Sequence, residues 1–188
     1  MVQTLLEHSA PVTSESHYFS YGNFNPDLVM QVIEAVVPGT AKDFIENELL
    51  SKLGITNYRW LTSVSGLPES GWGSSMTSRD MLKWGTLVMK KGKWNNEQLI
   101  PETFIAKSTS RIIYTGDDDV YGGGKDVSGQ GYGYYWWNAD LKYVDKSYFS
   151  SSAQGGGGQY IIIIEELDLM VVVTAHENDN STLQIMAE

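Results

Sequence analysis

The 188-residue sequence contains no cysteine. It can therefore form no disulfide, use no thiolate nucleophile and bind no zinc through thiolates. Basic side chains are also scarce, because 13 lysines and arginines stand against 23 aspartates and glutamates, a formal net charge of −10. A non-specific nucleic-acid binder needs a positively charged surface, so the charge argues against that class. It also disfavours adhesion to anionic lipid.

Long apolar runs are missing too. The two longest, 160–164 and 169–175, are separated by Glu165, Glu166 and Asp168. Each is far shorter than the roughly 20 residues that a membrane-spanning helix needs, so no membrane span is expected. No basic segment followed by an apolar one opens the chain, and the compartment stays unknown. The length fits one domain or a large part of one, and no repeat or linker divides residues 1–188.

Common catalytic motifs are absent as well. No serine has glycine both two positions before and two positions after it, and no lysine follows a serine by three positions. The chain therefore has neither a nucleophile elbow nor a Ser-x-x-Lys motif. His8, His17 and His176 lie far apart without the spacing of a metal site. A Ser-His-Asp triad is recognised by its geometry, and composition alone does not predict one.

Two unusual loops invite functional readings. Asp117, Asp118 and Asp119 offer oxygen ligands that calcium accepts, but their spacing is not that of an EF-hand, so we expect a solvated loop and no metal. Gly155–Gly158 precede a predicted strand rather than a helix, which argues against a phosphate-binding loop and a nucleotide cofactor. Such glycines mark a bulge or the close approach of a ligand, and they can aim backbone N–H groups at an oxyanion.

Periodicity predicts helices first and a sheet afterwards. Apolar residues at three- and four-residue spacing indicate helices at 26–37, 41–53, 78–90 and 101–108. Asn25 is expected to cap the first helix, and Thr40 and Thr77 the next two. Segment 55–76 is interpreted as a long ordered loop, and segment 116–133 as exposed.

Three strands are predicted, at 132–138, 159–164 and 169–175. The last two are joined by Glu165–Asp168 and read as a hairpin. Their uninterrupted isoleucines and valines predict central strands that are covered on both faces. Helices followed by an antiparallel sheet indicate the α+β class.

Six segments, in order along the chain, resemble motifs of the penicillin-recognising serine hydrolases, which include class C β-lactamases, DD-peptidases and related esterases and amidohydrolases. Residues 4–10 resemble "LLTHTSG", and Phe19-Ser20-Tyr21-Gly22-Asn23 is similar to "F-x-Y-S-N". Further resemblances are segment 44–56 to "F-x-x-x-x-I-x-x-P-L-G-M-T", segment 75–85 to "S-T-A-R-D-L-x-R-F-G", segment 131–137 to "G-Y-G-x-x-W-W", and segment 153–160 to the glycine-rich third motif. The resemblance implies a β-lactamase/transpeptidase-like fold, an antiparallel sheet packed by helices, of which this chain is a partial domain.

The resemblance also implies roles for particular residues. In the family the serine of Ser-x-x-Lys attacks an acyl carbon, and the lysine and the motif tyrosine handle its proton. Tyr21 would be the proton-relay tyrosine and Asn23 its polar companion. Gln154, Gly155 and Gly156 would bind the substrate and its oxyanion, with the N–H donor at about Gly156.

Departures from the family pattern refine the expectation. The Ser-x-x-Lys segment normally precedes the match at 4–10, so the chain is interpreted as a C-terminal portion whose partner is the N-terminal part of the same protein. The third-motif lysine or histidine falls on Ala153, which favours an ester or amide over a carboxylate-bearing substrate.

The expected function is hydrolysis of a small ester or amide through an acyl-serine. The alternatives are a catalytically silent binding or scaffold module and an unrelated acidic α+β domain. Family members suggest a periplasmic or secreted location.

Overall fold

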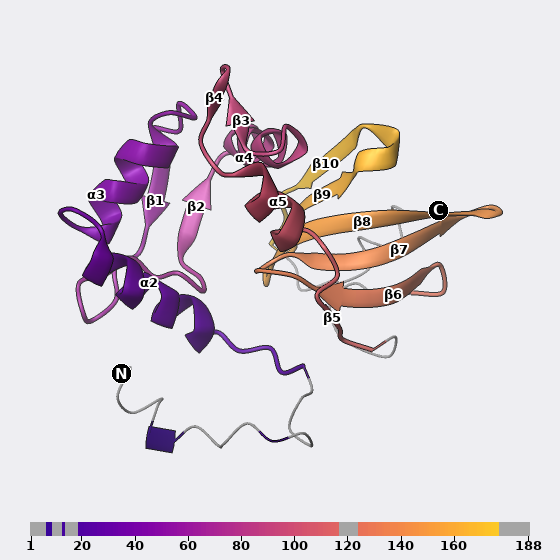
Figure 1. Cartoon of the computed structure of the whole chain (residues 1–188), viewed down its shortest axis with the longest axis horizontal. Coiled ribbons are helices and arrows are strands. Elements are labelled where there is room, and N and C mark those ends of the chain that lie inside the picture. The colour runs from indigo at the N-terminus through magenta and orange to yellow at the C-terminus, as the bar shows by residue number, and fades with distance from the viewer. Residues whose placement is uncertain (1–6, 9–12, 14–18, 117–123, 177–188) are drawn as a thin grey trace.

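The computed structural model describes residues 7–8, 13, 19–116 and 124–176. Helices lie at one end of the molecule and a twisted sheet at the other (Figure 1). The helical elements are α2 (Phe24–Val36), α3 (Ala41–Ile45), the π-helix η1 (Glu46–Leu50), α4 (Ser78–Met89), α5 (Glu102–Ser108) and the 3-10 helix η2 (Glu165–Leu167). The strands are β1 (Tyr58–Trp60), β2 (Ser74–Met76), β3 (Lys93–Trp94), β4 (Glu97–Gln98), β5 (Ile113–Tyr114), β6 (Val127–Tyr132), β7 (Trp137–Tyr143), β8 (Lys146–Gly155), β9 (Gln159–Ile164) and β10 (Leu169–Val173).

The four predicted helices are present, with one cap misplaced. Thr40 and Thr77 each accept a hydrogen bond from the backbone N–H three residues later, as predicted. The prediction of Asn25 as the first cap is wrong, because α2 begins at Phe24 and Asn23 occupies the N-cap position. The Asn23 side chain makes no capping hydrogen bond.

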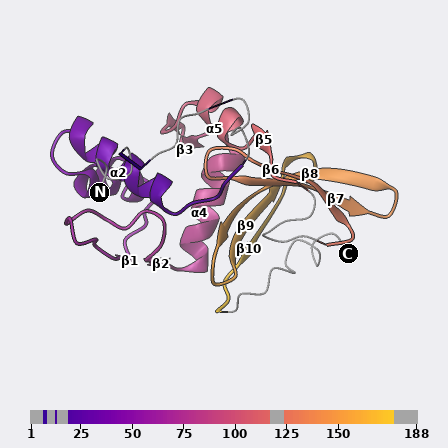
Figure 2. The same cartoon turned by 90° about the horizontal axis from the view of Figure 1, so that it is seen from below.

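The six-stranded sheet of the described residues is antiparallel, in the order β10-β9-β8-β7-β6-β5. Alternation along β9 sends its isoleucines to two separate cores. Ile162 and Ile164 lie with Tyr160 in the cluster on one face. Ile161 and Ile163 pack on the other face against residues of α4 and α5. Figure 2 shows α4 beside β9 and β10, so this helix covers one face of the hairpin.

The predicted hairpin is confirmed in its pairing and corrected in its position. β9 and β10 are adjacent and antiparallel, with Val171 opposite Ile162. Ile161 and Ile162 are both buried, at 7% and 1% exposure. β10 is not central, however, because it forms the edge of the sheet among the described strands.

Two other strand predictions are wrong. Segment 132–138 is not one strand, since β6 ends at Tyr132 and β7 begins at Trp137. Between them the Gly133 N–H donates to the Trp136 carbonyl, and Tyr135 adopts a φ of 64°. Segment 55–76 is not only loop, because β1 and β2 pair antiparallel within it.

The glycine-rich stretch at 116–133 is exposed only in part. Val127 and Gln130 of β6 are buried, at 6% and 2% exposure. The aspartate run at Asp117–Asp119 lies outside the described residues, so the expectation of a solvated loop stays a prediction. Among the residues that the structure describes, no helix is long and apolar enough to cross a membrane.

Candidate active site

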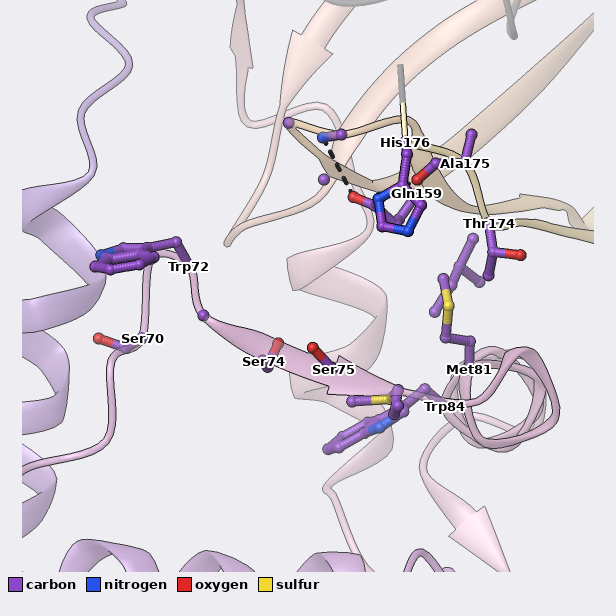
Figure 3. A pocket seen from close by; sticks show the side chains of 17 residues that line it. Ser70, Trp72, Ser74, Ser75, Met81, Trp84, Gln159, Thr174, Ala175 and His176 are labelled. Carbon is purple, nitrogen blue, oxygen red and sulfur yellow. Dashed lines mark hydrogen bonds between the residues drawn. The ribbon is translucent and has the colours of Figure 1, made fainter. Parts of the chain in front are cut away.

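An open cavity of about 850 Å³ lies between the β2–α4 region and the loop that joins β8 to β9 (Figure 3). Its size falls within the range usual for small-molecule sites. The lining residues come from four places in the sequence: the segment up to β2, the helix α4, the β8–β9 loop, and the end of β10. They are Ser70, Gly71, Trp72, Gly73, Ser74, Ser75, Met76, Met81, Trp84, Gly155, Gly156, Gly157, Gln159, Ile161, Thr174, Ala175 and His176.

The helix α4 forms one wall, and its cap fixes where that wall starts. The Thr77 hydroxyl accepts from the Asp80 N–H at 3.1 Å and donates to the Asp80 carboxylate at 2.7 Å. The hydroxyl thereby satisfies one of the unpaired N–H groups at the helix start and is itself held by the Asp80 side chain. The Lys83 ammonium donates a hydrogen bond to the Asp80 carboxylate at 2.8 Å. This bond, together with the one from the Thr77 hydroxyl, lowers the pKa of the Asp80 carboxyl. One turn into the helix, Met81 and Trp84 reach the cavity.

The β8–β9 loop forms the opposite wall. Gly155 ends β8, and the Gly158 N–H donates to the Gly155 carbonyl at 3.1 Å, which closes a tight turn. The Gln159 side chain braces this turn, since its oxygen accepts from the Gly157 N–H at 3.2 Å and its nitrogen donates to the Ala175 carbonyl. The loop is therefore held from within and tied to the chain beyond β10.

Gly156 is the residue of the β8–β9 loop that the neighbouring side chains leave uncovered. A Cβ atom added there would meet nothing within 4 Å. Its backbone N–H makes no hydrogen bond to another residue in the described part of the chain. A backbone N–H that lines an open cavity can donate to an oxygen that becomes negatively charged during a reaction.

Gly155 and Gly156 line the cavity, whereas Gln154 does not. Gln154 pairs with Tyr160 in the sheet. Its side chain therefore lies on the same face as Tyr160, opposite to the face of Ile161. Its amide nitrogen donates to the Ser152 hydroxyl at 2.8 Å. The substrate-binding role of all three residues stays a prediction.

Neither Tyr21 nor Asn23 belongs to the lining of the cavity. The Tyr21 ring packs on Trp137 at 5.4 Å between centroids and edge-on to Tyr132 at 6.1 Å, and the residue is 46% exposed. The Asn23 carbonyl oxygen lies 3.0 Å from where a Cβ atom on Gly71 would stand, and Gly71 lines the cavity. Tyr21 is therefore not a buried core residue, and its proposed role in proton transfer stays a prediction.

Several lining residues were not predicted as site residues from the sequence. Ser70, Ser74 and Ser75 sit in the segment interpreted as a loop, and only the β1–β2 pairing brings two of them to the cavity wall. His176 reaches the cavity from beyond β10, far from them in sequence. No short motif contains these residues together, so nothing local could have grouped them.

The described residues include no group of three or more histidines, aspartates or glutamates that could hold a metal ion. Among the described residues, the lining of the cavity contains no lysine, arginine, aspartate or glutamate, and His176 is the one ionisable side chain there. The polar contributions to the cavity are therefore hydroxyls, amides and backbone groups.

Comparison with known proteins identifies the family. The β-lactamase family model matches residues 2–187. None of the curated proteins matches the chain.

Solved structures share the fold at low sequence identity. A putative 6-aminohexanoate-dimer hydrolase from Bacillus anthracis superposes with a TM-score of 0.72 at 16% identity over 99% of this chain and 45% of that one. A putative β-lactamase from Bacteroides dorei gives 0.71 at 15% identity over 98% and 61%. An octameric penicillin-binding protein homologue from Pyrococcus abyssi gives 0.65 at 18% identity over 94% and 43%. The chain thus spans less than two thirds of these structures, has a partial β-lactamase/transpeptidase-like fold, and belongs to the β-lactamase family.

Proposed function

We propose that this chain forms the oxyanion side of a serine hydrolase that cleaves small esters or amides through an acyl-serine. The observation that supports this proposal most directly is the unbonded Gly156 N–H on the wall of the cavity. The nucleophile is assigned to a polypeptide segment outside the chain, because no Ser-x-x-Lys motif is present in it.

The proposed reaction assigns each group one task. A serine oxygen attacks the substrate carbonyl carbon, and the carbonyl oxygen takes up the negative charge and accepts a hydrogen bond from the Gly156 N–H. The alcohol or amine leaves with a proton relayed by Tyr21, and water then hydrolyses the acyl-serine. Removal of one oxyanion donor typically lowers kcat by about 10²–10³-fold.

Labelling with a fluorophosphonate tests this assignment. The chain alone is expected to show no labelled serine. A protein in which a Ser-x-x-Lys segment precedes this chain is expected to be labelled at that serine. Tyr21→Phe in that protein should lower turnover by about 10²–10⁴-fold while the fold is kept, since a general acid–base group is lost.

Gly156 allows a matched pair of variants. Gly156→Pro removes the N–H and should lower the labelling rate of the complete protein strongly. Gly156→Ala keeps the N–H and adds a methyl group where the structure has open space, so it should retain the rate. Equal rates in the two variants would contradict the oxyanion role.

The second candidate function is a catalytically silent binding or scaffold module. The absence of a Ser-x-x-Lys motif from this chain favours it. It predicts no fluorophosphonate labelling in any form of the protein, and no change in binding when Gly156→Pro is introduced.

A further inference from the structure

We propose that the cavity selects uncharged substrates that carry an aromatic or other apolar group and discriminates against carboxylates. That the bound molecule is a substrate rests on the proposed function. The selectivity between neutral and charged molecules rests on the cavity wall alone. It concerns the part of the site that this chain contributes.

The described residues of the wall include no lysine or arginine that could pair with a carboxylate. Its polar side chains are serine and threonine hydroxyls, one glutamine amide and His176. An anion that binds against such a wall loses part of its hydration and gains no ion pair. This loss of hydration costs free energy. A neutral ester or amide loses less on entry and needs only hydrogen bonds.

Three basic side chains in or next to α4 and the sheet are bonded away from the cavity. Lys83 of α4 donates to Asp80 and to the Gly54 carbonyl, and does not line the cavity. Lys91 and Arg111 line a separate cavity, where Lys91 pairs with Glu165, and Arg111 pairs with Asp140 of β7. Lys83, Lys91 and Arg111 are thus each paired with a carboxylate.

The charge of the whole chain acts in the same direction. A net charge of −10 produces a negative potential around the molecule. That potential lowers the local concentration of anions and leaves neutral molecules unaffected.

Aromatic and thioether groups supply the attraction. Trp72 stands on the rim with 62% of its surface exposed. Figure 3 shows Trp72 on one side of the cavity and Gln159 on the other, with Trp84 and Met81 of α4 below Gln159. An apolar ring that stacks on the Trp72 indole would leave a carbonyl group free to reach the Gly156 N–H across the cavity.

A matched pair of small molecules tests the selectivity by binding, without turnover. The probes are N-acetylphenylalanine N-methylamide, which is neutral, and N-acetylphenylalanine, which differs by carrying a carboxylate. Titration of the ¹⁵N-labelled chain, followed at the tryptophan indole N–H signals, should show the neutral probe binding at least about tenfold more tightly. Trp72→Ala should weaken the neutral probe and leave the fold unchanged.

One substitution should invert the preference. Thr174 is exposed on the cavity wall, so Thr174→Lys adds a cation with little effect on packing. It should bring the affinity for the carboxylate up to that for the neutral probe or above it, whereas Thr174→Gln should not. Equal affinities in the unmodified chain, binding of neither probe, or shifts confined to tryptophans away from the cavity would overturn the proposal. Because no serine reacts in this experiment, its failure is distinct from failure of the labelling test.

Discussion

Gly85 of α4 lies so close to Met170 of β10 that a Cβ atom on the glycine would come within 2.1 Å of the methionine sulfur. The same atom would lie 2.9 Å from the Ile161 Cγ2 of β9. The helix therefore approaches the β9–β10 hairpin more closely than a side chain at position 85 permits. This contact sets the position of α4, and with it of Met81 and Trp84 on the cavity wall.

Gly85→Ala should destabilise the protein by up to about 2 kcal/mol. Alanine gains about 1 kcal/mol of helix propensity over glycine, but overpacking a tight contact costs about 1–3 kcal/mol. The buried and β-branched Ile161 cannot move away as easily as the methionine sulfur. The free energy of unfolding in urea measures the difference.

Gly22→Ala is the matched control for this prediction. A Cβ atom at Gly22 would meet nothing within 4 Å, so the unfolding free energy should change by no more than about 0.5 kcal/mol. A stabilising effect of Gly85→Ala would show that α4 can shift outward at little cost.

Local patterns predicted the helices because helix signals are local. Thr77 followed by Asp80 gave both the start of α4 and the geometry of its cap. Strands that depend on distant partners were missed. The polar β8 is the clearest case, since the buried Ser150 looks unlike a core residue until its hydroxyl is seen to donate to the Ala139 carbonyl of β7.

The site was predictable only where it coincides with a motif. Gly155 and Gly156 line the cavity as the glycine run suggested. Gln159, which braces that run, was placed in a strand without any role, because its bond to the Ala175 carbonyl joins positions 16 residues apart. A one-dimensional pattern gives no indication of such a pairing.

Thr77→Ala should cost about 0.5–2 kcal/mol, the usual range for loss of an N-cap hydroxyl. Thr86→Ala on the same helix is the control. The Thr86 hydroxyl donates to the Leu82 carbonyl within the helix, a bond that contributes little, while alanine raises helix propensity. Urea unfolding should therefore rank the two variants with Thr77→Ala clearly the less stable. The opposite ranking would assign the start of α4 to packing rather than to its cap.

Asp80 should make stability fall in acid. Its hydrogen bonds from Lys83 and Thr77 hold the pKa of the folded carboxyl below the ordinary value of 3.8. The stabilisation is therefore present above pH 3.8 and is lost as the pH falls from there through the lowered pKa. The difference in Tm between the unmodified chain and Asp80→Asn should shrink over that interval. Glu166→Gln, which removes an exposed carboxylate, should show no such convergence.

Gln159→Met should loosen the β8–β9 loop and leave the rest of the sheet intact. The substitution removes the acceptor of the Gly157 N–H and the donor to the Ala175 carbonyl, while a side chain of similar length is kept. A hydrogen bond of this kind contributes about 0.5–1.5 kcal/mol, so the Gly157 amide should exchange with solvent on the order of tenfold faster. Gln98→Met provides the comparison, because Gln98 also makes two bonds, to the carbonyls of Lys91 and Ile100, but on the β3–β4 side of the molecule. Exchange at Gly157 should respond to the first variant and not to the second. If both variants accelerate it equally, the loop is ordered by the sheet as a whole, and Gln159 does not hold the glycines that face the cavity.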